Sequence, residues 1–177
     1  MFAILIAGQG TAGLEIAAQA KALGADLDAV IVCCGGGGLT AGCATAIASE
    51  SPDTEIYIAE PEGFDDTRRS LTAGERLSND PNARSICDAL LAPTPGVLTF
   101  AINRRLVTAG YAVSDAEVRR AMAVAFSDLK LVIEPGGAAA LTAVLSGKFA
   151  IKGKTVAVTA SGGNVDRETF AAALAQA

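Results

Sequence analysis

Short apolar runs alternate along this chain with longer amphipathic stretches, and this alternation restricts the fold more than any other feature of the sequence. Residues 2–7, 29–34, 55–60 and 155–160 are rich in Ile, Val and Ala and are bounded by glycine or charged residues. Such runs are typical of strands buried on both faces of a parallel sheet. A weaker strand is predicted around residues 111–113.

Helices are predicted between the strands, over residues 11–23, 39–49, 66–73, 114–129, 137–146 and 166–175. Ser114 and Glu117 form a capping-box pattern at the start of one of them. Strand–helix–strand order predicts a doubly wound, mostly parallel sheet with helices on both faces, which is a three-layer α/β fold. We expect one Rossmann-like domain over residues 1–177, with residues 72–96 as an irregular excursion because they contain several breakers.

The residue types present exclude several classes of function. The chain has no histidine, which rules out a Ser-His-Asp or Cys-His nucleophile and a histidine-ligated zinc site. Its net charge of −5 argues against nucleic acid or an anionic membrane as a partner, and no apolar run is long enough to span a bilayer. The four cysteines have no Cys-x-x-Cys spacing, as expected for reduced thiols of a cytoplasmic protein.

Three glycines near the start of the chain match a known spacing. Gly8, Gly10 and Gly13 fit the Gly-x-Gly-x-x-Gly turn that joins a strand to a helix in dinucleotide-binding domains. The acidic residue that should end the second strand and bind a ribose is missing, because that strand ends in Cys33 and Cys34. A tight strand-to-helix turn is therefore favoured over a dinucleotide site.

Four consecutive glycines, Gly35, Gly36, Gly37 and Gly38, follow the second predicted strand and precede a helix. Each costs up to about 1 kcal/mol of backbone entropy relative to Ala. The run exposes backbone N–H groups at the positive end of the following helix, an arrangement that suits a phosphate without Lys or Arg. A flexible turn is the alternative. The segment that begins at Ser161, Ser-Gly-Gly-Asn, follows the last predicted strand, and we expect it at the same edge of the sheet unless it is only a turn.

Several motifs in a fixed order resemble the fold type II pyridoxal-phosphate enzymes. They are the tetraglycine with Leu39, the Ile-Glu-Pro stretch around Glu134 and the Ser-Gly-Gly-Asn segment, supported by residues 7–11 and 86–90. The most similar branch is the serine/threonine dehydratases, which include serine racemase and hydroxyaspartate ammonia-lyase. The resemblance implies the C-terminal part of the large domain of an enzyme that eliminates water from a hydroxy amino acid, giving a 2-keto acid and ammonia.

The resemblance also implies roles for single residues. Gly35–Gly38 and the Leu39 N–H would bind the phosphate of pyridoxal phosphate, and the Ser161 hydroxyl would bind the pyridine nitrogen. Glu134 is assigned to the cofactor site, with the alternative that it ends a strand and positions the next helix. A Mg²⁺ or Ca²⁺ ion would be held by the residues Glu60, Phe64 (through its carbonyl) and Asp66, for which a solvated acidic loop is the alternative.

The lysine that carries the cofactor as a Schiff base in this family, within a Ser-x-Lys-x-Arg-Gly segment, has no counterpart here. The five lysines are Lys21, Lys130, Lys148, Lys152 and Lys154, and none lies in such a segment. We expect no catalytic residue in this chain, and a segment that is inactive alone and associates with the missing portion or with itself as a dimer. The alternatives are a stand-alone module for a nucleotide or another phosphorylated metabolite, and a non-catalytic partner of a complete paralogue.

Overall fold

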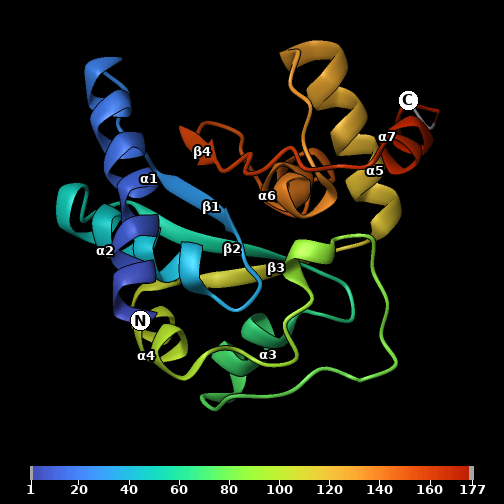
Figure 1. Ribbon diagram of the computed structural model, residues 1–177. Helices are drawn as coiled ribbons and strands as arrows, with labels where there is room; N and C mark the ends of the chain where they lie inside the picture. The colour runs from blue at the N-terminus through green and yellow to red at the C-terminus, as the bar shows by residue number, and fades with distance from the viewer. Residues whose placement is uncertain (1, 176–177) are drawn as a thin grey trace.

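The fold is built on a parallel sheet of four strands in the order β3-β2-β1-β4 (Figure 1). The computed structural model describes residues 2–175. The strands are β1 (Ala29–Cys33), β2 (Glu55–Pro61), β3 (Ala109–Val113) and β4 (Val156–Val158). β2 and β1 are the two inner strands, and every residue of β1 is buried.

Seven α-helices and two short helices connect the strands within the described residues. They are α1 (Phe2–Ala22), α2 (Gly38–Glu50), α3 (Asp66–Ala73), α4 (Val97–Leu106), α5 (Asp115–Val124), α6 (Pro135–Leu145), α7 (Arg167–Leu174), the 3₁₀-helix η1 (Asp88–Leu90) and the π-helix η2 (Ala125–Leu129). Over the same part of the chain, no helix combines the length and apolar character needed to cross a membrane.

Each face of the sheet is covered by its own hydrophobic cluster. Ile31 of β1 packs on one side with Met122 of α5 and Ala139 of α6. Val32 packs on the other side with Ile47 of α2. Successive side chains of a strand point to opposite faces, so a strand between two helical layers must be apolar throughout. The predicted α/β fold, with a parallel sheet and helices on both faces, is confirmed.

Most predicted elements are present, with small differences at their ends. The capping box is formed: the Ser114 hydroxyl accepts from the Glu117 N–H at 3.3 Å, and the Ser114 N–H donates to the Glu117 carboxylate at 2.7 Å. The predicted helix over residues 114–129 changes from α to π geometry after Val124. Helix α4 was not predicted.

The predicted strand over residues 2–7 is wrong. These residues form the first turns of α1, which continues without interruption to Ala22. Ile4 is 78% exposed and Leu5 is 52% exposed, so the run is not a buried strand. A short apolar run fits a strand or a helix equally well when its neighbours are unknown.

The same helix removes the basis for a dinucleotide site. Gly8, Gly10 and Gly13 lie inside α1, so they form no turn and open no helix N-terminus. Instead, α1 packs closely on α2: a Cβ added to Gly13 would lie 2.8 Å from the Cys43 Cα, and one added to Gly42 would lie 2.5 Å from the Gly10 nitrogen. Gly10, Gly13 and Gly42 are needed for close packing of two helix backbones, whereas Gly8 is not.

We therefore predict opposite effects for two glycine substitutions in this pair of helices. Gly42→Ala should lower the free energy of unfolding by about 1–3 kcal/mol, because α1 must move away from α2. Gly8→Ala should raise it by about 0.5–1 kcal/mol, because no atom lies within 4 Å of its added Cβ and Ala is the better helix former. Urea unfolding of both variants tests this, and equal effects would contradict the packing role.

Candidate functional site

The tetraglycine joins the central strand β1 to helix α2. β1 ends at Cys33, and α2 begins at Gly38. Gly37 has a φ of 85°, a left-handed conformation that side chains rarely adopt, and an added Cβ would lie 3.1 Å from Thr99. Gly35 is also confined, because its added Cβ would lie 3.0 Å from the Leu90 Cα. By contrast, Gly36 faces open space.

A pocket of about 270 Å³ lies at this end of the sheet. Its lining combines segments that are far apart in the sequence: Cys33, Gly35, Gly36, Gly37, Gly38, Leu39, Ala89, Leu90 and Ser161. Six of these residues, the four glycines, Leu39 and Ser161, were singled out in the sequence. The structure thus places the glycine loop and the Ser161 loop around one space.

The glycine loop presents its backbone donors to this pocket. Among residues 2–175, none of the N–H groups from Gly35 to Leu39 has a protein acceptor. The first turn of α2 contains no acidic side chain, so nothing there offsets the partial positive charge at the helix N-terminus. Unpaired amides at a helix start, uncovered by side chains, bind anions such as phosphate.

Ser161 lies in a loop whose backbone is hydrogen-bonded to Glu134. The Glu134 N–H donates to the Gly162 carbonyl at 3.1 Å, and the Glu134 carboxylate accepts from the Asn164 N–H at 2.9 Å. The Ser161 N–H donates to the Gly137 carbonyl of α6 at 3.4 Å. Glu134 is not among the residues that line the pocket. Its contacts are those of a residue that supports the Ser161 loop and starts α6.

The sequence did not indicate three other residues that line the pocket. Ala89 and Leu90 come from η1 and form the wall opposite the glycines, and only their place in the 86–90 similarity hinted at them. Cys33 lies at the base, where its sulfur contacts the Gly137 carbonyl and the Ala140 N–H, each at 3.4 Å. Burial raises the pKa of the Cys33 thiol, which keeps it protonated and unsuited to attack.

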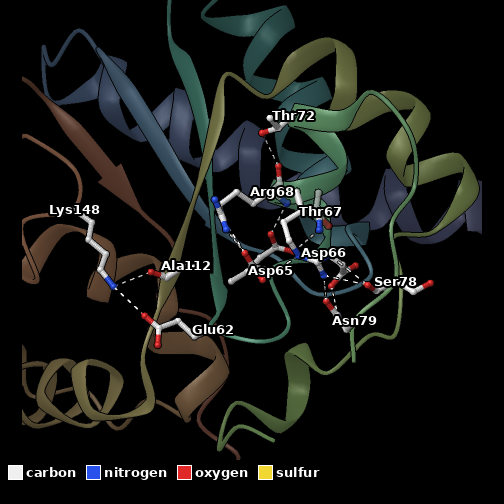
Figure 2. Close-up of polar contacts among 12 residues, drawn as sticks. Glu62, Asp65, Asp66, Thr67, Arg68, Thr72, Ser78, Asn79, Ala112 and Lys148 are labelled. Carbon is white, nitrogen blue, oxygen red and sulfur yellow. Dashed lines mark hydrogen bonds and ion pairs between the residues drawn. The ribbon is translucent and has the colours of Figure 1, made fainter. Parts of the chain in front are cut away.

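A second group of predicted residues lies where β2 ends and α3 begins. Glu60 is fully buried, and its two carboxylate oxygens accept the N–H groups of Thr67 at 3.1 Å and Arg68 at 2.7 Å. Asp66 is also fully buried: one oxygen accepts from the Asn79 amide at 2.6 Å (Figure 2), and the other has no hydrogen-bond partner among the described residues.

Among the described residues, these two acids form no salt bridge. Both arginines of α3, Arg68 and Arg69, instead pair with Asp65, and Figure 2 shows the Arg68 pair. Burial is the main cause that raises the pKa of Glu60 to about 8, and it also raises the pKa of Asp66. In residues 2–175, no three Asp, Glu, Cys or His side chains converge as metal ligands. A cation here would need carbonyl and water oxygens beside the two carboxylates.

A larger depression of about 800 Å³ lies elsewhere, between the end of α1 and the loop after α2. It is lined by three acidic residues, Asp26, Glu50 and Asp53, and by one lysine, Lys21. The excess of carboxylates disfavours an anion, and none of the predicted site residues lies there. The smaller pocket is therefore the candidate site.

Comparison with known proteins agrees with this geometry. Residues 3–162 match the family described as "Pyridoxal-phosphate dependent enzyme". The chain is 41% identical over 165 residues to a serine racemase of Dictyostelium discoideum, covering 92% of this chain and 49% of that protein. It is 38% identical over 162 residues to a beta-hydroxyaspartate dehydratase of Paracoccus denitrificans, covering 92% and 50%.

A solved structure of maize serine racemase shares the fold. It superposes with a TM-score of 0.84 at 35% identity, covering 97% of this chain and 52% of that one. The chain thus spans about half the length of the curated relatives it matches. Because the family match extends over nearly all of its residues, the chain belongs to the pyridoxal-phosphate dependent enzymes.

Proposed function

We propose that this chain supplies the phosphate-binding and ring-binding part of a pyridoxal-phosphate-dependent ammonia-lyase that acts on a β-hydroxy amino acid. The observation that carries the proposal is the pocket in which unpaired glycine amides and the Ser161 loop face one space. The dehydratases and racemases among the relatives support the substrate class.

In this proposal, the glycine loop binds the phosphate. The N–H groups from Gly35 to Leu39 donate to its oxygens, and the N-terminus of α2 adds a favourable field. Cys33 is protonated, so the base of the pocket carries no negative charge that would repel the dianion. The glycines leave no side chain between the backbone and the ligand.

Ser161 orients the ring. Its hydroxyl donates a hydrogen bond to the pyridine nitrogen but places no carboxylate beside it, so it does not hold the ring in the protonated state. When bound, the cofactor supplies an electron sink for the α-carbon of the amino acid. A weaker sink favours prompt loss of the β-hydroxyl over a long-lived carbanion, in agreement with a dehydratase.

The base for this chemistry must come from outside the described pocket. Among the described residues no lysine lines the pocket, and Lys148 is paired with Glu117 at 2.7 Å near the end of β3. We propose that a lysine-bearing portion completes the site and that this chain alone binds the cofactor without a covalent bond. Exposed apolar side chains such as Ile4 and Val97, 78% and 71% exposed, favour association with that portion or with a second copy.

We also propose a divalent cation beside Glu60 and Asp66, with the Phe64 carbonyl and water as further ligands. The unpaired, buried Asp66 oxygen supports it, because a buried carboxylate oxygen without a donor is costly. Oxygen ligands suit Mg²⁺ or Ca²⁺. The ion would hold the loop between β2 and α3 in place.

Phosphate binding by the glycine loop should stabilise the chain. Pyridoxal phosphate should raise the melting temperature of the chain more than NAD does. Gly36→Asp should abolish this shift, because its carboxylate would bring a negative charge into the glycine loop, where the nearest atom beyond its chain neighbours to an added Cβ, on Ala92, lies 4.0 Å away. The neutral Gly36→Asn, of the same size, should keep part of the shift and serves as the matched control.

Two outcomes would contradict the proposal. Stabilisation by NAD alone would favour a nucleotide-binding module. A tight adduct of pyridoxal phosphate that borohydride reduces onto one of the lysines of the isolated chain would show that the chain needs no further portion. Mass spectrometry after reduction distinguishes that covalent adduct from non-covalent binding.

The buried acids Glu60 and Asp66 should make the stability of the chain depend on pH. The folded state raises the pKa of Glu60 from 4.5 to about 8, so it holds the proton more tightly than the unfolded chain does. Stability should therefore fall as pH rises from about 4.5 to 8 when no divalent cation is present. Mg²⁺ or Ca²⁺ should restore stability at the upper end of this range, as measured by urea unfolding at each pH.

Glu60→Gln tests the assignment of this effect, with Glu50→Gln as a control at an exposed acid. Glu60→Gln should flatten the pH dependence and remove the response to the cation, and Glu50→Gln should change neither. A response to Mg²⁺ that persists in Glu60→Gln would count against the cation site.

A further inference from the structure

Helix α4 packs against α2 and reaches the back of the glycine loop (Figure 1). The Thr99 hydroxyl donates to the Gly36 carbonyl at 2.7 Å, and the Asn103 amide donates to the Gly37 carbonyl at 3.4 Å. The Gly96 N–H, just before α4, is a second donor to the Gly36 carbonyl, at 3.3 Å. Two consecutive carbonyls of the loop are therefore bound from the same helix.

The planar peptide bond transmits this contact to the pocket. In a trans peptide, the carbonyl of one residue and the N–H of the next point in opposite directions. A Gly36 carbonyl fixed toward α4 turns the Gly37 N–H away from α4. The Gly37 carbonyl, fixed by Asn103 and by the Ala41 N–H at 2.9 Å, does the same for the Gly38 N–H. Both N–H groups belong to residues that line the pocket.

The two side chains on α4 are buried and closely fitted. Thr99 is 7% exposed and Asn103 is 1% exposed. Within residues 2–175, the Asn103 Oδ1 atom has no hydrogen-bond partner. Flipping the Asn103 amide would place Oδ1, an acceptor, against the Gly37 carbonyl, which is also an acceptor. The observed orientation keeps the hydrogen bond to the loop and leaves Oδ1 unpaired.

We infer that Thr99 and Asn103 are positioning residues that aim the Gly37 and Gly38 amides at the ligand phosphate. The inference rests on the proposed function of the pocket. It adds that α4, a helix outside the pocket, orients the Gly37 and Gly38 N–H groups. Without these donors, the Gly36 carbonyl would keep only the Gly96 N–H and the Gly37 carbonyl only the Ala41 N–H, in a segment of the residue type that has the most backbone freedom.

The test compares Thr99→Val with Thr99→Ser in the full chain, titrated with inorganic phosphate and observed through amide NMR signals. Thr99→Val keeps the shape of the side chain and removes its hydroxyl, and Thr99→Ser keeps the hydroxyl. We expect Thr99→Val to weaken phosphate binding about fivefold to tenfold, as for one lost hydrogen bond. The phosphate-induced shifts of the Gly37 and Gly38 signals should decrease, and Thr99→Ser should restore both.

The signals of Gly162 and Gly163 in the Ser161 loop provide an internal control, because a general loss of structure would move them as well. If wild type shows phosphate-induced shifts and Thr99→Val retains them with unchanged affinity, the positioning role is overturned while phosphate binding stands. If the wild-type chain shows no shift at Gly37 or Gly38 at any phosphate concentration, both the positioning role and the proposed phosphate site are overturned.

Discussion

The parallel pairing of β1 with its two neighbours is the interaction on which the rest of this structure depends. Ile31 of β1 is in register with Tyr57 of β2 on one side and with Val158 of β4 on the other. This register places the residues that follow the three strands at one edge of the sheet. The Thr159 N–H continues the ladder by donating to the Ile31 carbonyl at 3.0 Å. The tetraglycine, the acidic segment after β2 and the Ser161 loop therefore leave the sheet from adjacent strands, as the ends of parallel strands must.

Glycine serves two unrelated purposes in this chain, and the difference is one of environment. In α1 and α2, glycine lets two helix backbones approach more closely than side chains allow, as at Gly42, where an added Cβ would overlap the backbone of α1. In the loop before α2, glycine permits the left-handed backbone of Gly37 and leaves amides uncovered. The first use contributes packing energy, and the second leaves backbone N–H groups unpaired, as the proposed phosphate binding requires. A spacing of glycines in sequence does not distinguish the two.

Unpaired polar groups lie close to the proposed phosphate and cation sites. Three kinds of polar group have no protein partner among the described residues: the N–H groups from Gly35 to Leu39, one Asp66 oxygen and the Asn103 Oδ1 atom. Buried groups of this kind reduce stability unless a ligand, an ion or water completes their hydrogen bonds. Their grouping along the strand ends, beside well-packed apolar layers, agrees with the proposal that phosphate and a cation bind there.

The sequence by itself determined the strands β1 to β4, the capped start of α5 and the glycine and serine residues that line the pocket. Apolar runs, capping residues and four consecutive glycines act on the backbone next to them, so they can be interpreted without the tertiary structure. Only the tertiary structure decided that residues 2–7 are helical, since an apolar run takes the conformation that its neighbours allow, and here α2 provides a groove for a helix. Likewise, only the structure brought Thr99 and Asn103 to the glycine loop. Their side chains are ordinary in sequence, and their roles arise from contacts between elements far apart in the chain.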